Sequence, residues 1–218
     1  IVGLWELLGD HDDALDYVGR LLGATGRVLP MALVPMDITA DVRGLVPDHP
    51  DALVSVRGQV EVATTDGMID SIALVPPDPP AAPEALKAIE AADWVVLGPG
   101  SWFTSVLPHL MVPALRHALV NTDARAIVVL NLAAEAGETP GFGAADHLRV
   151  LAEHAPDLPI HTVLADQHLG SEELADLEQV VAAYGAQLVV DDVAEAPGTP
   201  RHDPVKLAAA FSRILAGG

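Results

Sequence analysis

Cysteine is absent from the 218 residues of this sequence, which excludes disulfide bonds, thiolate metal sites and a cysteine nucleophile. Lysine is rare as well, with Lys87 and Lys206 standing against nine arginines. No hydrophobic run is long enough for a membrane-spanning helix, because runs such as 127–130 are strand length and a spanning helix needs roughly 20 residues. The pattern of a signal peptide is also missing. We therefore expect a cytoplasmic protein.

Positive charge is scarce throughout the chain. Eleven basic side chains stand against 31 acidic ones, which gives a formal net charge of −20 and a sequence pI near 4.5. Nucleic-acid backbones and anionic membrane surfaces repel a polyanion, so we expect neither as the main partner. A local basic pocket can still bind a phosphate, which leaves phosphorylated small molecules open. Half of the residues are hydrophobic, which is enough to build a sizeable buried core.

The part of the chain after residue 90 alternates short apolar runs with helical patterns. The predicted strands lie at 94–97, 126–130, 160–164 and 188–190, and the predicted helices lie at 106–119, 144–154, 171–184 and 204–215. Strands that are apolar throughout and alternate with helices indicate a parallel sheet covered on both faces. The sequence therefore predicts a three-layer, Rossmann-type α/β fold with a mainly parallel sheet. In such sheets, ligands bind along the edge where the strands end.

The first 75 residues predict smaller elements. Asp10 can cap a helix that ends at Gly23. Apolar residues then alternate with polar ones over 52–62 and recur over 69–75, with turn residues at 65–67 between them. This arrangement predicts a β-hairpin beside the parallel sheet.

A proline-rich stretch separates the two parts of the chain. Five prolines fall within 76–83, and we expect this stretch to be a short extended bridge inside one fold. The chain 1–218 is therefore predicted to form a single α/β domain. Because it begins directly with the apolar Ile1, we expect the domain to be incomplete at its N-terminus.

The most informative segment joins the predicted strand 94–97 to the following helix. It contains Gly98, Pro99, Gly100, Ser101, Thr104 and Ser105. The glycines permit a close backbone approach, and amides at a helix N-terminus together with hydroxyl groups would form an anion cradle. The spacing matches neither a Walker A loop nor the Rossmann GxGxxG pattern. The alternative is a tight strand-to-helix turn that Ser101 caps.

A second polar loop follows the predicted strand 126–130, at the same edge of the sheet. Asn131 can bind a base, a ribose or a sugar hydroxyl, and Glu138 and Thr139 precede the next helix. The alternative is that Thr139 caps this helix while Glu138 is solvated.

Arg201 lies in the loop between the last predicted strand and the last predicted helix. Its planar guanidinium suits a diphosphate, and the alternative role is a surface salt bridge. We expect the Gly98 turn and the Arg201 guanidinium to converge on one cleft at the edge where the strands end.

Asp146 and His147 lie in the first turns of the helix predicted at 144–154. A histidine beside an aspartate can serve in acid–base chemistry, but adjacent residues on a helix diverge by roughly 100° and do not face each other. The nine histidines show no metal-ligand spacing such as HExxH. We therefore predict neither a dyad nor a metal site.

Together these segments resemble the gluconeogenesis factor (YvcK) family, the larger relatives of the CofD phospholactate transferases, in an actinobacterial form. The matching segments follow the family's order along nearly the whole chain. They are Gly26-Arg27-Val28-Leu29-Pro30, Leu97 to Pro108, Gly137-Glu138-Thr139, Ala145-Asp146-His147-Leu148 and Arg201-His202-Asp203. The resemblance implies a CofD-like fold, and it adds Arg27 and His202 to the candidate ligand-binding residues.

The resemblance also implies a function, which is the binding of a UDP-sugar such as UDP-N-acetylglucosamine in the cytoplasm. This function would link gluconeogenic carbon metabolism to cell-wall synthesis and cell shape, with no established catalysis. Gly98, Gly100, Ser101 and Thr104 would hold phosphate or sugar, while Asn131 and Arg201 would hold a polar edge and the diphosphate. Implied partners are regulators of cell-wall synthesis and other copies of the chain.

Two other functions stay open on the sequence. One is a CofD-type transferase that moves a phosphorylated group from a nucleoside diphosphate carrier to a small acceptor, with a divalent metal such as Mg²⁺. The other is a structural or partner-docking domain without a ligand.

The sequence departs from the family in three places. The family opens with a strand and a Gly-Gly-Gly-Thr-Gly loop that cradles phosphate, and this chain lacks both. After Asn131, residues 132–136 replace the usual Met-Thr-Gln, which removes polar groups. Pro204 stands where some relatives carry a phosphorylated threonine, so we expect no kinase control at that position.

Overall fold

A computed structural model of the protein describes residues 2–133, 139 and 141–217, and it contains a four-stranded parallel sheet. The strand order is β4-β5-β6-β7, so consecutive strands are neighbours. Their bounds are Trp94–Leu97, Arg125–Val129, Thr162–Asp166 and Gln187–Asp191. The apolar runs of the sequence thus form the predicted parallel strands, each within two residues of the expected start.

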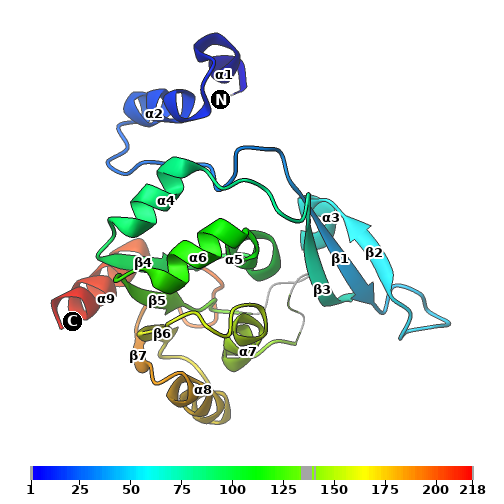
Figure 1. The fold of residues 1–218 in the computed structure, drawn as a ribbon. Helices are drawn as coiled ribbons and strands as arrows, with labels where there is room; N and C mark the ends of the chain where they lie inside the picture. The colour runs from blue at the N-terminus through cyan, green and yellow to red at the C-terminus, as the bar shows by residue number, and fades with distance from the viewer. Residues whose placement is uncertain (1, 134–138, 140, 218) are drawn as a thin grey trace.

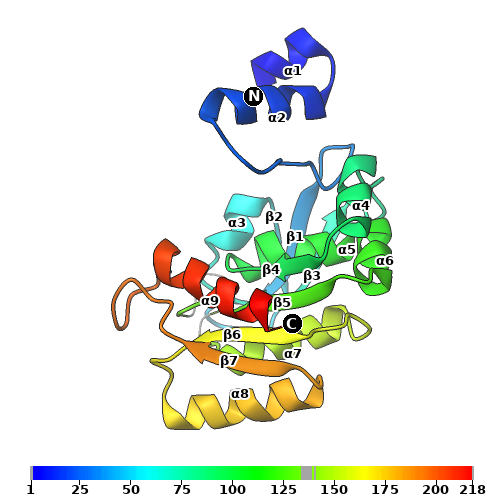
Figure 2. The same cartoon turned by 90° about the vertical axis from the view of Figure 1, so that its left-hand side faces the viewer.

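Helices cover both faces of this sheet and create the three predicted layers. Val128 and Val163 point into the main core, which includes residues of the helices that connect the strands. Ile127 and Leu164, which alternate with them, point to the other face and pack with Ala210 of the last helix. Figure 2 shows this helix lying across its face of the sheet. Strands buried on both faces need apolar residues at every position, which is the pattern that the sequence contains.

The connecting helices agree with the prediction except after β4. The bounds are Leu107–Met111 for α5, Pro113–Asn121 for α6, Ala144–His154 for α7, Ser171–Ala183 for α8 and Pro204–Ala216 for α9. The single helix expected over 106–119 is divided into a π-helical turn η1 at Trp102–Val106, α5 and α6. Pro113 causes the division between α5 and α6, because proline disfavours helical conformation in the residue before it.

The predicted hairpin is wrong in its pairing. The strands β2 (Val54–Arg57) and β3 (Met68–Val75) lie on opposite sides of a central strand β1 (Asp37–Arg43), and both pair with it antiparallel. The helix α3 (Gln59–Ala63) occupies part of the expected first strand. The protein does contain a small antiparallel sheet (Figure 1), and the apolar face of this sheet packs into the same core as the parallel sheet.

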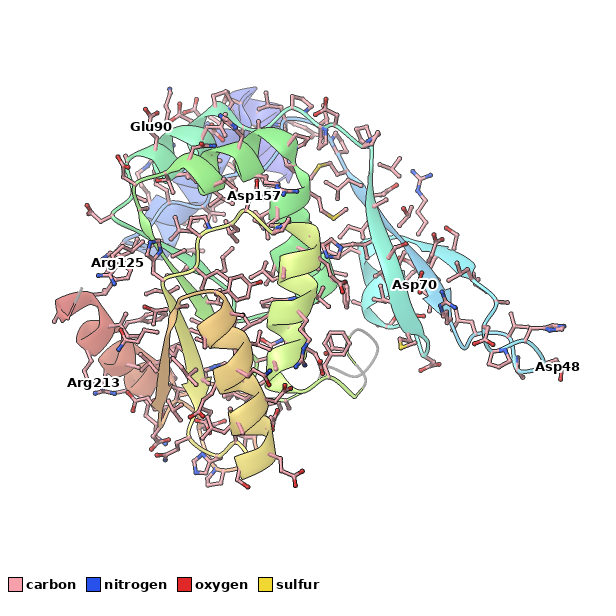
Figure 3. The ribbon with its side chains drawn as sticks, turned by 60° about the horizontal axis from the view of Figure 1, so that its bottom comes forward. Asp48, Asp70, Glu90, Arg125, Asp157 and Arg213 are labelled. Atoms are coloured by element: carbon pink, nitrogen blue, oxygen red, sulfur yellow. The ribbon has the colours of Figure 1, made fainter. Side chains whose placement is uncertain are left out.

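Charged side chains lie on the exposed face of the antiparallel sheet, where Figure 3 labels Asp70. On the antiparallel sheet, Arg43 pairs with Asp70 at 2.8 Å across neighbouring strands. Among the helices that the structure describes, none combines the length and the apolar character that crossing a membrane requires.

Two helices precede these sheets and stand apart from them in both views (Figures 1 and 2). They are α1 (Val2–Leu8) and α2 (His11–Leu22). Asp10 caps α2 through bonds from the amides of Asp12 and Asp13, and Gly23 ends it in the left-handed conformation, as the sequence predicts. The proline-rich stretch bridges β3 to α4 (Pro83–Glu90), and its end pairs with the segment after α2 at Ala32 and Ala81.

The turn after β4 requires glycine at position 98. Gly98 has a φ of +76°, and a Cβ atom there would lie 2.7 Å from the carbonyl oxygen of Val129 on the neighbouring strand. The turn therefore packs directly on the end of β5, with no room for a side chain.

We expect Gly98→Ala to lower the free energy of unfolding by at least about 2 kcal/mol, because it combines left-handed backbone with a steric overlap. Urea denaturation measures this value. The control is Gly170→Ala, at a φ of −64° with no atom within 4 Å of the added Cβ, where we expect about 1 kcal/mol or less. Equal losses of stability in the two variants would contradict the requirement for glycine at position 98.

Candidate functional site

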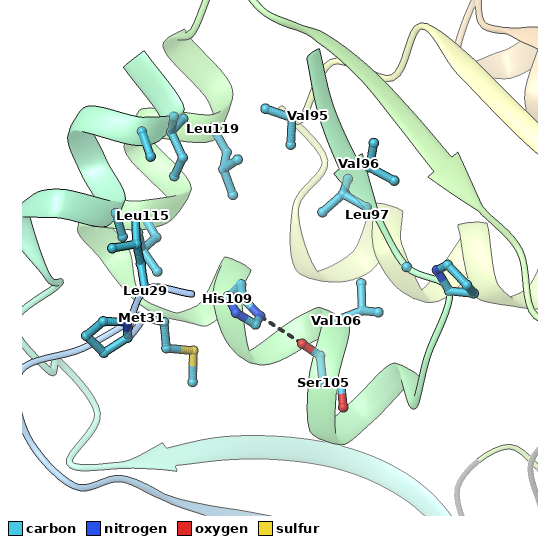
Figure 4. Close-up of a pocket in the computed structure, with 16 residues that line it drawn as sticks. Leu29, Met31, Val95, Val96, Leu97, Ser105, Val106, His109, Leu115 and Leu119 are labelled. Atoms are coloured by element: carbon cyan, nitrogen blue, oxygen red, sulfur yellow. Dashed lines mark hydrogen bonds between the residues drawn. The ribbon is translucent and has the colours of Figure 1, made fainter. Parts of the chain in front are cut away.

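Two cavities lie near the edge where the parallel strands end. The first, the β4 pocket, has a volume of about 370 Å³ and lies between β4, α4 and α6 (Figure 4). It is lined by Leu29, Pro30, Met31, Ala85, Ala88, Ile89, Val95, Val96, Leu97, Gly98, Pro99, Ser105, Val106, His109, Leu115 and Leu119. These residues are nearly all apolar, and none carries a carboxylate, an ammonium or a guanidinium group.

Polar groups in the β4 pocket are few. The His109 ring bonds through Nδ1 to the backbone oxygen of Ser105 at 2.7 Å (Figure 4). Three predicted site residues, Gly98, Pro99 and Ser105, line this pocket. Its surface suits an apolar group and offers little to a phosphate or a sugar.

The second cavity, the α7 pocket, has a volume of about 290 Å³. It lies beside the ends of β5 and β6 and the first residues of α7 and α8. Its lining is Asn131, Leu132, Ala133, Phe142, Gly143, Ala144, His147, Asp166, His168, Leu169, Glu173, Ala194, Gly198 and Thr199. This cavity combines apolar walls with several polar side chains, as ligand sites in open α/β sheets do.

The Asn131 side chain locks the loop after β4 to the loop after β5. Its Oδ1 accepts a hydrogen bond from the Gly100 amide at 3.0 Å, and its Nδ2 donates to the Gly100 carbonyl at 2.9 Å. Asn131 also lines the α7 pocket. Its amide therefore has a structural task, which the sequence did not indicate.

Three groups of the predicted anion cradle are engaged within the protein. The Gly100 amide is bound by Asn131, and the hydroxyl groups of Ser101 and Thr104 bond to each other. Thr104 is also buried. The structure thus favours the alternative for this segment, a tight strand-to-helix turn, although Ser101 makes no side-chain cap.

His147 lies in the wall of the α7 pocket and is 2% exposed. Its ring makes edge-to-face contacts with Trp102 and Phe142, at centroid distances of 5.1 and 5.6 Å. Nδ1 lies 3.2 Å from the carbonyl oxygen of Gly143. Burial lowers the pKa of His147 and outweighs the backbone contacts and the nearby Asp146 charge, which raise it.

Asp146, which lies beside His147 in the first turn of α7, has a structural task. Asp146 accepts a bond from the Gly143 amide at 2.8 Å and pairs with Arg149, so it completes the cap of the helix and does not face His147. Thr139 is fully buried. Glu138 lies outside the described residues, so its predicted role stays untested.

Asp166, at the end of β6, organises the far side of the α7 pocket. Its Oδ2 accepts bonds from the amides of Val193 and Ala194, at 3.1 and 3.0 Å. Its Oδ1 accepts from the His168 amide at 2.9 Å and lies 2.6 Å from His168 Nδ1. Burial alone would raise the pKa of Asp166, but these four hydrogen bonds outweigh it and hold the pKa below its ordinary value.

Asp166, His168 and Glu173 also line this pocket and were not predicted from the sequence, although it contains a signal for Asp166. Asp166 directly follows an apolar run at the end of β6, as Asn131 directly follows the apolar run of β5. Applying the strand-end rule to every strand would have found it.

One cluster in the described part of the chain has the residue types of a metal site. Ligand atoms of Asp166, His168 and Asp192 lie within 4.8 Å of one another. The two carboxylates of this cluster already have partners, however. Asp166 accepts four hydrogen bonds, and the Lys206 ammonium lies 2.9 Å from Asp192. Lys206 therefore offsets the charge of Asp192, while the Asp166 carboxylate is satisfied by hydrogen bonds from the protein.

Arg201 lies on the loop between β7 and α9, close in sequence to Gly198 and Thr199 of the α7 pocket. Its side chain is 81% exposed and lies 3.5 Å from Glu195. The neighbouring His202 forms a β-bridge with Ala194, so the loop folds back along the pocket wall. Burial lowers the pKa of His202, which the nearby Asp166 charge partly opposes.

The expectation of one cleft shared by the Gly98 turn and Arg201 is not met. Gly98 follows β4 and Arg201 follows β7, which lie at opposite ends of the strand order. Three strand spacings separate these positions, which is about 14 Å. Gly98 lines the β4 pocket, and Arg201 is not among the residues that line either cavity.

Arg27 is also placed outside this site. Its guanidinium bonds to both carboxylate oxygens of Asp16, at 2.9 and 3.0 Å, and it joins the segment after α2 back to that helix. Among the predicted residues, the α7 pocket therefore brings together Asn131 and His147, with Arg201 and His202 on the adjacent loop.

The sequence matches a known family over most of its length. The family model described as 2-phospho-L-lactate transferase CofD matches residues 1–201. A protein of Mycobacterium tuberculosis named "Putative gluconeogenesis factor" is 50% identical, and the match covers 99% of this chain and 63% of that protein. A protein of Mycobacterium leprae with the same name is 48% identical, with coverage of 100% and 60%. The chain thus spans less than two thirds of these relatives.

The fold also matches a solved structure. A crystal structure of a UPF0052 family protein from Bacillus halodurans superposes with a TM-score of 0.80 at 26% identity, covering 96% of this chain and 70% of that one. This match confirms the predicted α/β fold class.

We expect Asp166→Asn to lower the free energy of unfolding by about 2–3 kcal/mol, because the amide leaves backbone N–H donors without their charged acceptor. Urea denaturation tests this value. Asp176→Asn is the control, since Asp176 pairs with Arg149 at the surface, where both side chains are 45% exposed, and we expect less than about 1 kcal/mol. A stable Asp166→Asn protein would contradict the role of this carboxylate.

His147 predicts a pH dependence of stability. The pKa of His147 is lowered in the folded protein. Below the ordinary histidine pKa of about 6.5, the unfolded chain therefore binds a proton at this residue more readily than the folded chain does. The free energy of unfolding should therefore fall as the pH drops from 7.5 to 5.5, with His202 contributing in the same direction. His147→Gln should reduce this slope, and equal slopes for variant and wild type would refute the prediction.

Proposed function

Because this chain belongs to the CofD family, we propose that it binds a nucleotide sugar, with UDP-N-acetylglucosamine as the reference ligand. The α7 pocket would take the sugar, and the loop that carries Arg201 would take the diphosphate. The role is regulatory and not catalytic: binding in the cytoplasm would report on carbon metabolism to the machinery of cell-wall synthesis and cell shape.

The observation that carries this proposal is the polar α7 pocket at the edge where the parallel strands end. Ligand pockets commonly enclose about 300–1,000 Å³, and this one has about 290 Å³. It is large enough for one moiety of a nucleotide sugar and too small for the whole molecule. The rest of the ligand must therefore extend out of the pocket along its rim.

Electrostatics decides which end of the ligand enters. Asp166 and Glu173 both line the pocket, and the chain carries a net charge of −20. Both carboxylates repel a diphosphate, and the Glu173 carboxylate can also accept hydrogen bonds from sugar hydroxyls. The exposed Arg201, on the loop beside the pocket, offers its guanidinium to the phosphates.

The names of the mycobacterial relatives, which refer to gluconeogenesis, support a regulatory role. This chain spans 63% and 60% of those two proteins, so the activity of the whole protein is part of the proposal. Self-association and contact with regulators of cell-wall synthesis belong to it as well.

A second candidate, a CofD-type transferase, is favoured by the description of the family model. Such a reaction would require a divalent metal. The residues of the Asp166 cluster do not fit one as they are arranged, because hydrogen bonds and the Lys206 ammonium already occupy their carboxylates. We therefore derive no transfer step from this site.

Arg201→Ala should weaken the binding of UDP-N-acetylglucosamine about tenfold, which corresponds to the loss of a charged hydrogen bond of ~1.5–3 kcal/mol. Isothermal titration calorimetry measures the affinity. Arg213→Ala is the matched control: Arg213 pairs with Asp191 and lies with Arg125 in a separate cavity near the strand starts (Figure 3). Equal affinities of the Arg201 variant and wild type would remove Arg201 from the site.

A thermal-shift comparison separates the two candidates. A ligand that binds the folded chain stabilises it by RT ln(1 + [L]/Kd). We expect UDP-N-acetylglucosamine to raise the melting temperature, and GDP or GTP with Mg²⁺ to leave it unchanged. A shift with guanine nucleotides and Mg²⁺ alone would favour the transferase.

A further inference from the structure

We propose that His147 Nε2 accepts a hydrogen bond from a hydroxyl or amide N–H group of the sugar, and that this bond makes the chain prefer a nucleotide sugar to the bare nucleotide. The inference rests on the proposed function, because it assigns the sugar to the α7 pocket. It names one residue and one atom that would make the distinction.

The first observation is a buried polar atom without a partner. His147 Nε2 is shielded from solvent, and within the described part of the chain nothing forms a hydrogen bond with it. The neighbouring rings do not supply one, since Phe142 has no polar side-chain atom and the Trp102 Nε1 donor is itself unpartnered. Buried polar atoms normally have a partner, so an orphaned one in a pocket wall points to a ligand.

The tautomer of His147 determines which ligand group fits. Nδ1 lies 3.2 Å from the Gly143 carbonyl oxygen, and a carbonyl can only accept, so Nδ1 carries the proton. A neutral imidazole with a proton on Nδ1 has a lone pair on Nε2. Burial lowers the pKa of His147 and thereby favours this neutral form. Nε2 is therefore an acceptor that needs an O–H or N–H donor.

Two carboxylates in the wall of the pocket favour the same chemistry. The Glu173 carboxylate accepts a hydrogen bond from the Ala144 amide at 2.9 Å, and Asp166 also lines the pocket. His147 and Glu173 offer acceptors to a ligand, Asp166 adds negative charge, and none of these three side chains contributes a positive charge. Such a pocket favours a neutral group with several hydroxyl or amide donors, and it disfavours phosphate or carboxylate.

Two substitutions of His147 distinguish the contributions of its two ring nitrogens. Asparagine places its amide near the position of Nδ1, so His147→Asn can keep the bond to Gly143 but loses Nε2. Glutamine reaches the position of Nε2 and offers an oxygen acceptor there. The control is His154→Asn at the other end of α7, where Nδ1 lies 2.9 Å from the Val150 carbonyl oxygen in a similar arrangement.

The experiment measures the affinities of the 218-residue chain for UDP-N-acetylglucosamine and for UDP by calorimetry. We expect wild type to prefer the sugar nucleotide about tenfold, His147→Asn to lose this preference with unchanged UDP affinity, and His147→Gln to restore most of it. His154→Asn should behave as wild type. Circular dichroism and melting temperatures establish that each variant is folded.

The outcomes distinguish this inference from the function on which it rests. If wild type binds neither ligand, the proposed function fails and the inference fails with it. If wild type binds both equally, nucleotide binding stands but the α7 pocket takes no sugar. If His147→Asn keeps the preference for UDP-N-acetylglucosamine, His147 is a core histidine or binds a buried water, and the inference alone is overturned.

Discussion

The carboxylate of Asp166 is the interaction on which the candidate site depends. Asp166 ends β6, and its carboxylate accepts hydrogen bonds from the amides of Val193 and Ala194 and from the backbone amide and ring Nδ1 of His168. These bonds fasten the start of the β7–α9 loop to the strand next to it, and this loop supplies one wall of the α7 pocket and carries Arg201. Without the carboxylate, the backbone amides of His168, Val193 and Ala194 would lose their hydrogen-bond acceptor. The β7–α9 loop would then no longer be held in place as a wall of the α7 pocket.

The chemistry of the site follows from where charge is placed. Carboxylates and a neutral imidazole line the α7 pocket, while Arg201, 81% exposed, lies on its outer loop. A ligand that joins a neutral hydroxyl-rich part to a diphosphate matches this division, with the neutral part inside. The large negative charge of the chain favours the same placement of the ligand. Anionic groups are repelled from most of the surface, whereas the Arg201 guanidinium beside the pocket attracts them.

The sequence predicted the elements whose signal is local. Strands β4 to β7 were found because they are apolar on both faces, and α7 was found with its bounds because its apolar spacing is regular. Strand β1 was missed, since Asp37, Thr39 and Asp41 make it look like a polar loop until β2 and β3 pair with it. At the site, Asn131 and His147 were recognised. Their tasks were not, because the lock on Gly100 and the unpartnered Nε2 depend on contacts between residues far apart in the chain. The distance from Gly98 to Arg201 depends on the number of strands between them, which no local pattern reveals.

A crystal structure of the chain grown with UDP-N-acetylglucosamine tests the central claim most directly. We predict electron density for the sugar in the α7 pocket, with a hydroxyl or amide group within hydrogen-bond distance of His147 Nε2 and the diphosphate beside Arg201. Density for the ligand in the β4 pocket, or with its phosphates inside the α7 pocket against Asp166 and Glu173, would contradict it.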